Sequence, residues 1–376
     1  MIRVRTLLPQ RIRTILWGDR SRWGRTIRVD DPDWAEWQNT YSAFYLANQR
    51  SGLGLRVNAA GYDVASLVDF SGRTVLEVGA GSGALARHLP TDTDGVDCKL
   101  FALDDRLICY YLLQRRAGDP ESLEPQKPDE QNYIETRATY TDDGTSWSKS
   151  QRLYKPLANL WRPKVHDGTI YIANDYVALD RSDYITAAEE QNSKLYRIEL
   201  LRSQDGLNWE PVSLMLKGNP YFNVTETAIA FLPDGELFAF TRQNFISRSK
   251  PPYTQWTNQS AQMASGGIGG PSLIAFGNDI YVSGRYYGYL KDHGVASSPQ
   301  TNKIATSLWK FNHQTELFDR IADFPQPAYA DLGYTGFVST DDGVFMVYYS
   351  GHEHGETVEA RTRKADIYLS KIRIGG

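Results

Sequence analysis

Cysteine is scarce in this chain of 376 residues, and long hydrophobic runs are missing. Cys98 and Cys109 are too few for a framework of disulfide bonds, and their spacing does not fit a zinc site with four ligands. No apolar stretch approaches the roughly 20 residues that span a bilayer, and the amino end lacks the apolar block of a secretory signal. We therefore expect two buried thiols, no transmembrane segment and a cytoplasmic location.

A large excess of charge of either sign is also lacking. With 41 basic and 45 acidic residues the formal net charge is −4, so no global attraction to nucleic acid is expected. The 31 glycines, 17 prolines and 41% hydrophobic residues are typical of a folded, turn-rich protein and exclude disorder over most of the length. A chain of this length predicts several domains or one large repeat architecture.

Lysine is absent before Lys99, whereas arginine occurs throughout the chain. The first 28 residues hold eight arginines and a single acid, Asp19, with apolar residues between them. Residues 1–29 therefore form a basic amphipathic arm, for which two interpretations stay open: contact with an anionic surface, or a solvated tail. The change in composition near residue 98 predicts a domain boundary there.

One segment before that boundary has the order strand, glycine loop, helix. A buried-strand pattern at 74–78 is followed by Gly-Ala-Gly-Ser-Gly at 79–83 and a helix-compatible run at 84–89. Glycines let a ligand approach the backbone, and the amino end of a helix offers N–H donors. The stretch VLEVGAGSG at 75–83 resembles the first motif of class I S-adenosylmethionine-dependent methyltransferases. The resemblance implies that this cofactor would border Glu77, Gly79, Gly81, Gly83 and Asp97.

The methyltransferase resemblance is confined to residues 30–98. That family builds a sheet of several parallel strands, but nothing after residue 98 continues the alternation of strand and helix that a parallel sheet requires. We therefore predict a small, truncated α/β Rossmann-like fragment. Its two interpretations are a fused remnant that holds no cofactor and a methyltransferase completed by a partner.

An internal repeat dominates the chain from residue 99 onward. Five times an apolar strand, a tight turn with an acid and a second strand follow one another, at 100–112, 162–174, 227–241, 272–284 and 336–349. Further strands are expected at 133–140, 194–202, 306–311 and 367–374. Each unit therefore forms a four-stranded meander, and repeated meanders predict a β-propeller over 99–376. Five blades are visible in the sequence, and a sixth stays open.

Two turns between the outer strands share a second pattern. Residues 141–147 and 203–209 both have Ser or Thr, then Asp-Gly, then Trp, and a weakened copy lies at 249–256. The Asp and Ser/Thr side chains can bind local backbone N–H groups, glycine allows positive φ, and tryptophan packs onto the blade. These turns resemble the Asp boxes, or BNR repeats, of sialidase-type propellers. With LWRPK at 160–164, SGRYY at 283–287 and DLGYTG at 331–336, residues 97–376 resemble bacterial proteins of the sialidase superfamily.

In a propeller, the positions where the innermost strand of each blade begins and the second strand ends converge on one face of the molecule. Polar residues occupy several of these positions in the sequence. They are Arg162, Asp175, Glu226, Arg242, Arg285 and Tyr334, with His352 and His354 beyond the last hairpin. Guanidinium groups bind carboxylates through paired hydrogen bonds, which suits an acidic sugar. The resemblance implies that Tyr334 is the nucleophile, Glu226 its base, and the three arginines a carboxylate clamp. We therefore expect a glycoside hydrolase acting on an acidic or decorated sugar.

Several alternatives stay open at this point. The arginines could serve structural ion pairs, and Tyr334 could be a packing residue. Sialidases place the acid catalyst in the opening blade, which here begins at residue 97, so Asp175 and Asp97 both remain candidates. His352 is expected on a polar rim, because two histidines do not complete a metal site. A propeller that binds glycans without cleaving them is the main alternative function.

Overall fold

The structure is a computed structural model, and it describes residues 94–115, 131–143, 146–179, 184–186, 189, 192–218, 224–242, 244–261, 263, 267–286, 305–324, 334–340, 343–350 and 366–372. The predicted arm at 1–29 and residues 30–93 of the Rossmann-like segment lie outside this part. So do several predicted site residues, namely Glu77, Gly79, Gly81, Gly83, His352 and His354.

Within these residues the strands form five antiparallel sheets that follow one another along the chain. The first contains β1 (Asp94–Leu103), β2 (Arg106–Arg115), β3 (Gln131–Thr141), β4 (Gln151–Arg152) and β8 (Tyr184–Thr186). The second contains β5 (Ala158–Leu160), β6 (Lys164–His166), β7 (Thr169–Val177), β9 (Tyr196–Ser203) and β10 (Glu210–Lys217). The third contains β11 (Thr227–Phe231), β12 (Leu237–Thr241), β13 (Phe245–Ser249) and β14 (Thr257–Ser260).

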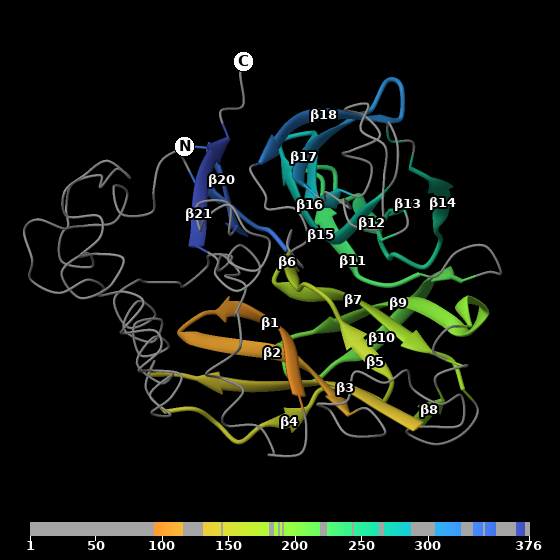
Figure 1. The fold of residues 1–376 in the computed structure, drawn as a ribbon, viewed down its shortest axis with the longest axis vertical. Coiled ribbons are helices and arrows are strands. Elements are labelled where there is room, and N and C mark those ends of the chain that lie inside the picture. Colours follow the sequence, from red (N-terminus) through yellow and green to blue (C-terminus); the bar gives the residue numbers. More distant parts are fainter. Residues whose placement is uncertain are drawn as a thin grey trace, which may run out of the picture.

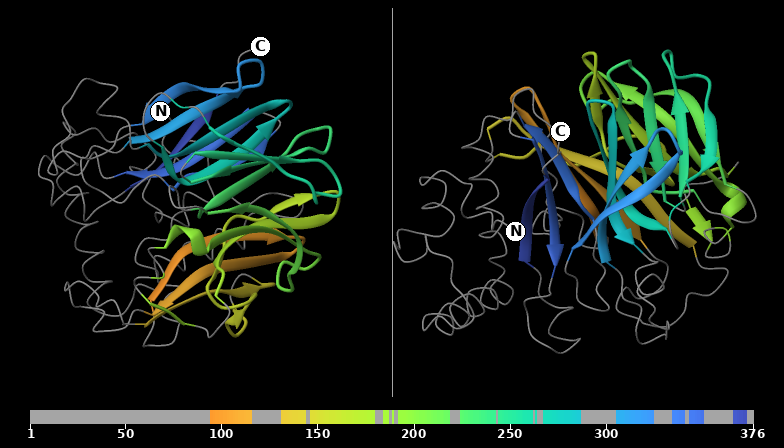
Figure 2. Two further views of the ribbon diagram at one scale, coloured as in Figure 1. Left: turned by 90° about the vertical axis from the view of Figure 1, so that its right-hand side faces the viewer. Right: turned by 90° about the horizontal axis from the view of Figure 1, so that it is seen from above.

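The fourth sheet contains β15 (Ile268–Phe276), β16 (Asp279–Tyr286), β17 (Ala305–Asn312) and β18 (Leu317–Phe324). The fifth contains β19 (Gly336–Thr340), β20 (Gly343–Ser350) and β21 (Asp366–Ile372). The sheets stand around a common centre (Figure 1), and the two turned views show their twisted, blade-like shape (Figure 2). The described residues therefore form a mainly β, five-bladed propeller, as the repeat predicted.

The five predicted hairpins are confirmed, because each turn joins two successive antiparallel strands, namely β1 and β2, β6 and β7, β11 and β12, β15 and β16, and β19 and β20. Left-handed backbone occurs at the turns, with φ of 47° at Asp167 and 71° at Gly168. Asp and Gly are among the residues that tolerate this conformation, which is why these turns could be found from sequence.

The first blade starts earlier than the predicted boundary after residue 98. β1 begins at Asp94, and its residues 94–96 already pair with β2. The backbone of Asp97 therefore lies within an antiparallel strand of the propeller, whereas the methyltransferase resemblance implied the end of a parallel strand. Lysine first occurs at Lys99, five residues after the first paired residue of β1, so this change in composition does not coincide with the start of the sheet.

Each middle blade is buried on both faces, because it packs between two neighbours. In β12, Phe238 and Phe240 pack with residues of the fourth blade, including Phe311, whose ring centroid lies 5.0 Å from that of Phe238. Leu237 and Ala239, which alternate with them, pack with the second blade. Successive side chains of a strand point to opposite faces, so the run Leu-Phe-Ala-Phe is apolar throughout rather than alternating.

The outer turn at 203–209 has the hydrogen bonds that its sequence predicts. Asp205 Oδ1 accepts from the amides of Leu207 at 2.9 Å and Asn208 at 2.8 Å, and Ser203 Oγ accepts from the amide of Gly206 at 2.9 Å. Gly206 has φ of 71°, and its carbonyl accepts a hydrogen bond from Tyr110 of the first blade. The turn therefore also fastens the second blade to the first.

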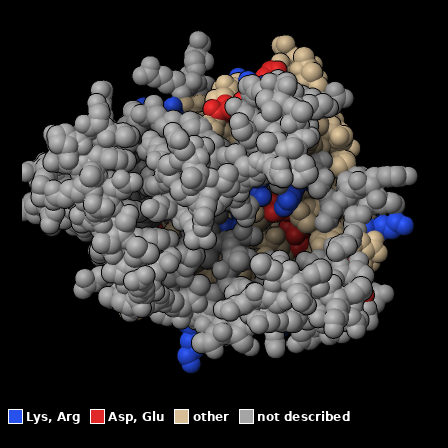
Figure 3. All heavy atoms as spheres, viewed as in Figure 1, with Lys and Arg blue, Asp and Glu red and all other residues tan. Residues whose placement is uncertain are grey.

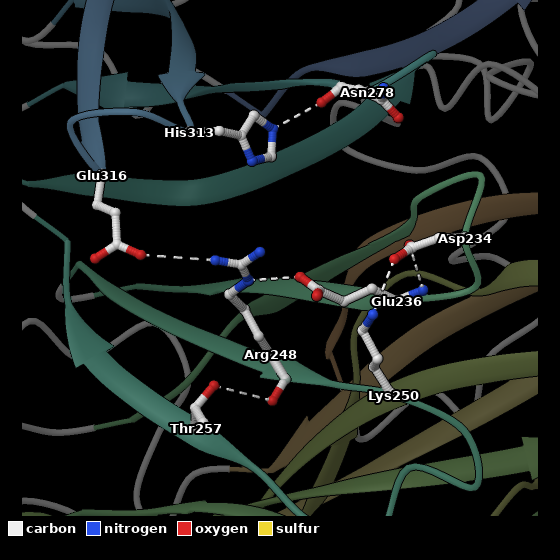
Figure 4. Close-up of polar contacts among 8 residues, drawn as sticks. All are labelled: Asp234, Glu236, Arg248, Lys250, Thr257, Asn278, His313 and Glu316. Carbon is white, nitrogen blue, oxygen red and sulfur yellow. Dashed lines mark hydrogen bonds and ion pairs between the residues drawn. The ribbon is translucent and has the colours of Figure 1, made fainter.

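Ion pairs of the third blade lie at the end opposite to the start of β11, and one of them reaches the fourth blade (Figure 4). Arg248 of β13 donates to Glu236 at 2.5 Å and lies 3.7 Å from Glu316 in the turn between β17 and β18. Lys250 pairs with Asp234 at 3.1 Å in the turn between β11 and β12. These contacts lie away from the predicted site, so their residues offer matched controls for it.

The thiol of Cys109 is buried and forms no disulfide, as expected. Among the residues that the structure describes, no helix has the length and apolar character needed to cross a membrane.

Candidate active site

All five blades contribute side chains or backbone groups to one cluster, which we call the central cluster. Its members are Lys99, Asn159, Trp161, Arg162, Asp175, Glu226, Arg242, Gly270, Arg285, Tyr334 and Thr335. Basic and acidic side chains meet in a recess near the middle of the face shown in Figure 3. The six described residues that the sequence predicted for the site all belong to this cluster.

Glu226 precedes β11 directly and is held from three directions. Its Oε1 accepts from Arg242 Nη1 at 2.7 Å, and its Oε2 accepts from the amide of Gly270 at 2.8 Å. Its own amide donates to Asp175 at 3.0 Å. The backbone of Glu226 has φ of 47°, a conformation that costs on the order of 1–3 kcal/mol for a residue other than glycine and that is concentrated at functional sites.

Asp175 lies on β7, where it is only 6% exposed. Burial, together with a smaller contribution from the charge of Glu226, raises the pKa of its carboxyl group from the usual 3.8 to about 7. The amide of Glu226, the charge of Lys99 and the side-chain amide of Asn159, 3.3 Å from Oδ1, oppose this increase. A carboxyl group with a pKa near neutrality can donate and accept a proton under physiological conditions, as acid–base catalysis requires.

The three predicted arginines have different surroundings. Arg242 is paired with Glu226, as described. Arg162 is 7% exposed and donates to the carbonyl of Thr335 at 2.7 Å, which links the second blade to the fifth. The guanidinium carbon of Arg285 lies 5.1 Å from the centroid of the Tyr334 ring. Two of the three guanidinium groups therefore lie beside the segment that contains Tyr334.

Tyr334 lies just before β19 and packs against Trp161. Its ring centroid is 6.1 Å from that of Trp161, a residue with no exposed surface. Lys99 Nζ lies 4.6 Å from the centroid of the Trp161 ring. Trp161 therefore connects a buried cation of the first blade with the tyrosine of the fifth.

Sequence reasoning missed Lys99, Trp161 and Gly270. Signals for two of them were present: Lys99 is a charged residue in a strand that is otherwise apolar to Leu103, and two glycines followed by proline at 269–271 are typical of a bulge. The role of Trp161 depends on a contact with a segment about a hundred residues away, which no local pattern reports. The side chain of Asp97 is not described, and among the described residues no group of three or more His, Cys, Asp and Glu could hold a metal ion.

Known proteins resemble this chain in structure and only distantly in sequence. No protein-family model matches the chain, and no curated protein matches it either. A crystal structure of a protein of unknown function from Dyadobacter fermentans is 18% identical, with 74% of this chain and 77% of that chain covered and a TM-score of 0.53. An α-L-arabinanase of Cellvibrio cellulosa is 11% identical, with 76% of this chain and 94% of that chain covered and a TM-score of 0.44. A mutant of the NanB sialidase of Streptococcus pneumoniae is 15% identical, with 63% of this chain and 34% of that chain covered and a TM-score of 0.38. At 18% identity the similarity to the Dyadobacter protein concerns the fold alone, and the five-bladed propeller itself follows from the order of the sheets in this chain.

Proposed function

We propose that this propeller is a glycoside hydrolase acting on an acidic or decorated sugar. The observation that carries the proposal is the pair of buried carboxyl groups Asp175 and Glu226, connected through the amide of Glu226. Their surroundings differ: Asp175 has a pKa of about 7, and Glu226 binds a guanidinium group and a backbone amide. Two carboxyl groups in different environments are the usual equipment of glycoside hydrolysis.

In the proposed first step the phenol oxygen of Tyr334 attacks the anomeric carbon while its proton passes to Glu226. The glycosidic C–O bond breaks, and Asp175 delivers its proton to the departing oxygen. Each oxygen of a carboxylate has two acceptor sites, so Glu226 retains capacity beyond its bonds to Arg242 and Gly270. A carboxylate near a tyrosine is needed because phenol is a weak nucleophile until its proton is removed.

In the second step water cleaves the bond between the tyrosine and the sugar. Asp175 takes a proton from the attacking water, whose oxygen bonds to the anomeric carbon. The proton held by Glu226 returns to the Tyr334 oxygen, so that every group ends as it began. Arg162 and Arg285, which contact Thr335 and Tyr334, would bind the acidic group of the sugar.

A glycan-cleavage screen on the full chain tests this proposal. The panel should contain glycosides of carboxylated sugars together with neutral ones, and the expected result is release of the acidic sugars. Glu226→Gln and Tyr334→Phe should abolish release without unfolding the protein. Glu236→Gln is the matched control for the first, because Glu236 also binds an arginine of the third blade, Arg248, at the opposite end.

Tyr281→Phe is the matched control for Tyr334→Phe. Tyr281 is a buried tyrosine of β16 in the same protein, and its hydroxyl group donates a hydrogen bond of 3.4 Å to Oδ2 of Asp279. Unchanged turnover in both Glu226→Gln and Tyr334→Phe would defeat the mechanism. Sugar binding in calorimetry without any release over long incubation would establish the alternative, a propeller that binds glycans but does not cleave them.

A further inference from the structure

The innermost strand of the fourth blade contains a β-bulge at the central cluster. Gly269 pairs with Arg285 and Ser272 pairs with Ser283, so β15 has one residue more than β16 between these pairs. The residues in between are Gly270, with φ of 59°, and Pro271, which has no N–H to offer the ladder. Bulges redirect backbone groups away from the neighbouring strand, and they are frequent beside active sites.

Both bulge residues use their backbone to hold side chains of other blades. The amide of Gly270 donates to Oε2 of Glu226 in the third blade at 2.8 Å. The carbonyl of Pro271 accepts from Nε1 of Trp161 in the second blade at 3.0 Å. In a regular strand adjacent residues direct these groups to opposite edges, so one of the two would face β16; the bulge leaves both of them for contacts with other blades.

The ring of Tyr334 packs directly onto the backbone of Gly270. A Cβ atom placed on Gly270 would lie 2.8 Å from both Cδ1 and Cε1 of Tyr334. Carbon atoms do not approach so closely, so any residue larger than glycine would displace the tyrosine ring or the strand. Gly270 therefore binds Glu226 through its N–H, and the ring of Tyr334 occupies the space that a side chain at position 270 would need.

We propose that the Gly270-Pro271 bulge is a positioning element that sets the separation between Tyr334 and the carboxylate of Glu226. It spaces them with backbone atoms of an inner strand, which is more rigid than a loop. The catalytic consequence of this spacing rests on the function proposed above, whereas the spacing itself does not.

The spacing is tested by thermal unfolding of the full chain with Gly270→Ala and a matched control. Gly277→Ala is that control, since Gly277 lies in the turn at the other end of β15, has φ of 57°, and has no atom within 4 Å of its added Cβ. Both changes impose the same backbone strain, but only the first meets Tyr334. We expect Gly270→Ala to lower the melting temperature further than Gly277→Ala, and the difference to vanish in a Tyr334→Ala background.

A difference that persists in the Tyr334→Ala background would overturn the proposal, as would equal effects of the two changes in the wild-type background. Should Gly270→Ala fail to fold, recovery of folding in Gly270→Ala/Tyr334→Ala supports the contact, and failure of the double variant contradicts it. These outcomes do not depend on any enzymatic activity.

The effect of Gly270→Ala on catalysis is measured with a glycoside that the wild type cleaves. Displacement of a reacting group by about 1 Å can cost on the order of 100-fold in rate, so Gly270→Ala should lose kcat on this scale with little change in KM, while Gly277→Ala retains wild-type kcat. A wild-type kcat in folded Gly270→Ala would overturn the positioning role. If the wild type cleaves no glycan, the proposed function fails while the unfolding experiment still decides the spacing.

Discussion

The backbone amide of Glu226 donates a hydrogen bond of 3.0 Å to Oδ1 of Asp175, which joins the carboxyl group of Asp175 in the second blade to the backbone at the start of the third blade. The residues are far apart in the sequence, and the propeller brings them together because strand ends of successive blades converge. The same amide hydrogen bond opposes the rise in pKa that burial imposes on Asp175. The stability of the protein and its proposed acid–base chemistry therefore depend on one contact.

Asp175 should make the protein less stable as the pH rises toward neutrality. Its pKa is raised from 3.8 to about 7, so the folded state binds the proton more tightly than the unfolded chain. The resulting stability is fully present below about pH 4 and is lost as the pH rises through about 7, with an upper limit of about 4 kcal/mol.

The variant Asp175→Asn cannot titrate at this position, so its stability relative to wild type should increase between about pH 4 and about pH 8. Denaturant unfolding at a series of pH values measures this difference. Asp234→Asn is the control, because the pKa of Asp234 is lowered, chiefly by the amide of Glu236, and its titration lies below this range. A constant difference between Asp175→Asn and wild type would show that Asp175 ionises normally.

Lys99→Met should move the pH profile of catalysis. The charge of Lys99 lowers the pKa of Asp175, so its removal raises that pKa further. If Asp175 donates the proton, the alkaline limb of kcat/KM shifts to higher pH, while the methionine keeps an apolar stem beside Trp161. Lys155→Met is the control, since it also removes a lysine charge but one that is paired with Glu199 at 2.8 Å. An alkaline limb at its original position would exclude this electrostatic role.

Arg285→Met should weaken binding of the acidic sugar more than it slows the chemical step. Hydrogen bonds to charged groups contribute about 1.5–3 kcal/mol, so KM should rise by about tenfold to a hundredfold. Arg320→Met is a control in the same blade, where Arg320 lies 5.7 Å from the centroids of the Tyr286 and Trp309 rings. A wild-type KM in folded Arg285→Met would remove Arg285 from the binding site.

Asp205→Ala should destabilise the propeller without changing its kcat. Burial opposes ionisation of Asp205, but its hydrogen bonds from Asn208, Leu207 and Ser203 outweigh burial and lower its pKa to about 2. The resulting stability is present at neutral pH and is lost as the pH falls through about 2.

Removal of these bonds should reduce the free energy of unfolding by about 1–3 kcal/mol at neutral pH. Gln204→Ala, at the preceding exposed position, should have a smaller effect. Comparable losses in the two variants would contradict a specific role of the turn aspartate.

Local rules were sufficient for the hairpins and not for the contacts between blades. Asp167-Gly168 and the turn at 203–209 were predictable because the residues that form them are adjacent in sequence. Trp161 and Pro271 are 110 residues apart, so neither position signals the other. The start of β1 at Asp94 was missed for a different reason, since the composition changes after the strand has begun.

The candidate site was predictable where a polar residue interrupts a strand pattern, as Glu226 does. The backbone donors of the site were not, because Gly270 contributes an N–H that every residue except proline has. Only the bulge and the positive φ give that group its direction.

The most direct measurement compares hydrolysis of a glycoside of a carboxylated sugar with that of its methyl ester, by wild type and by Glu226→Gln. The wild type should release the sugar from the free acid far faster than from the ester, and Glu226→Gln should release it from neither. Equal rates on acid and ester in the wild type, or undiminished release by folded Glu226→Gln, would contradict a site in which arginines bind the substrate and Glu226 takes part in its cleavage.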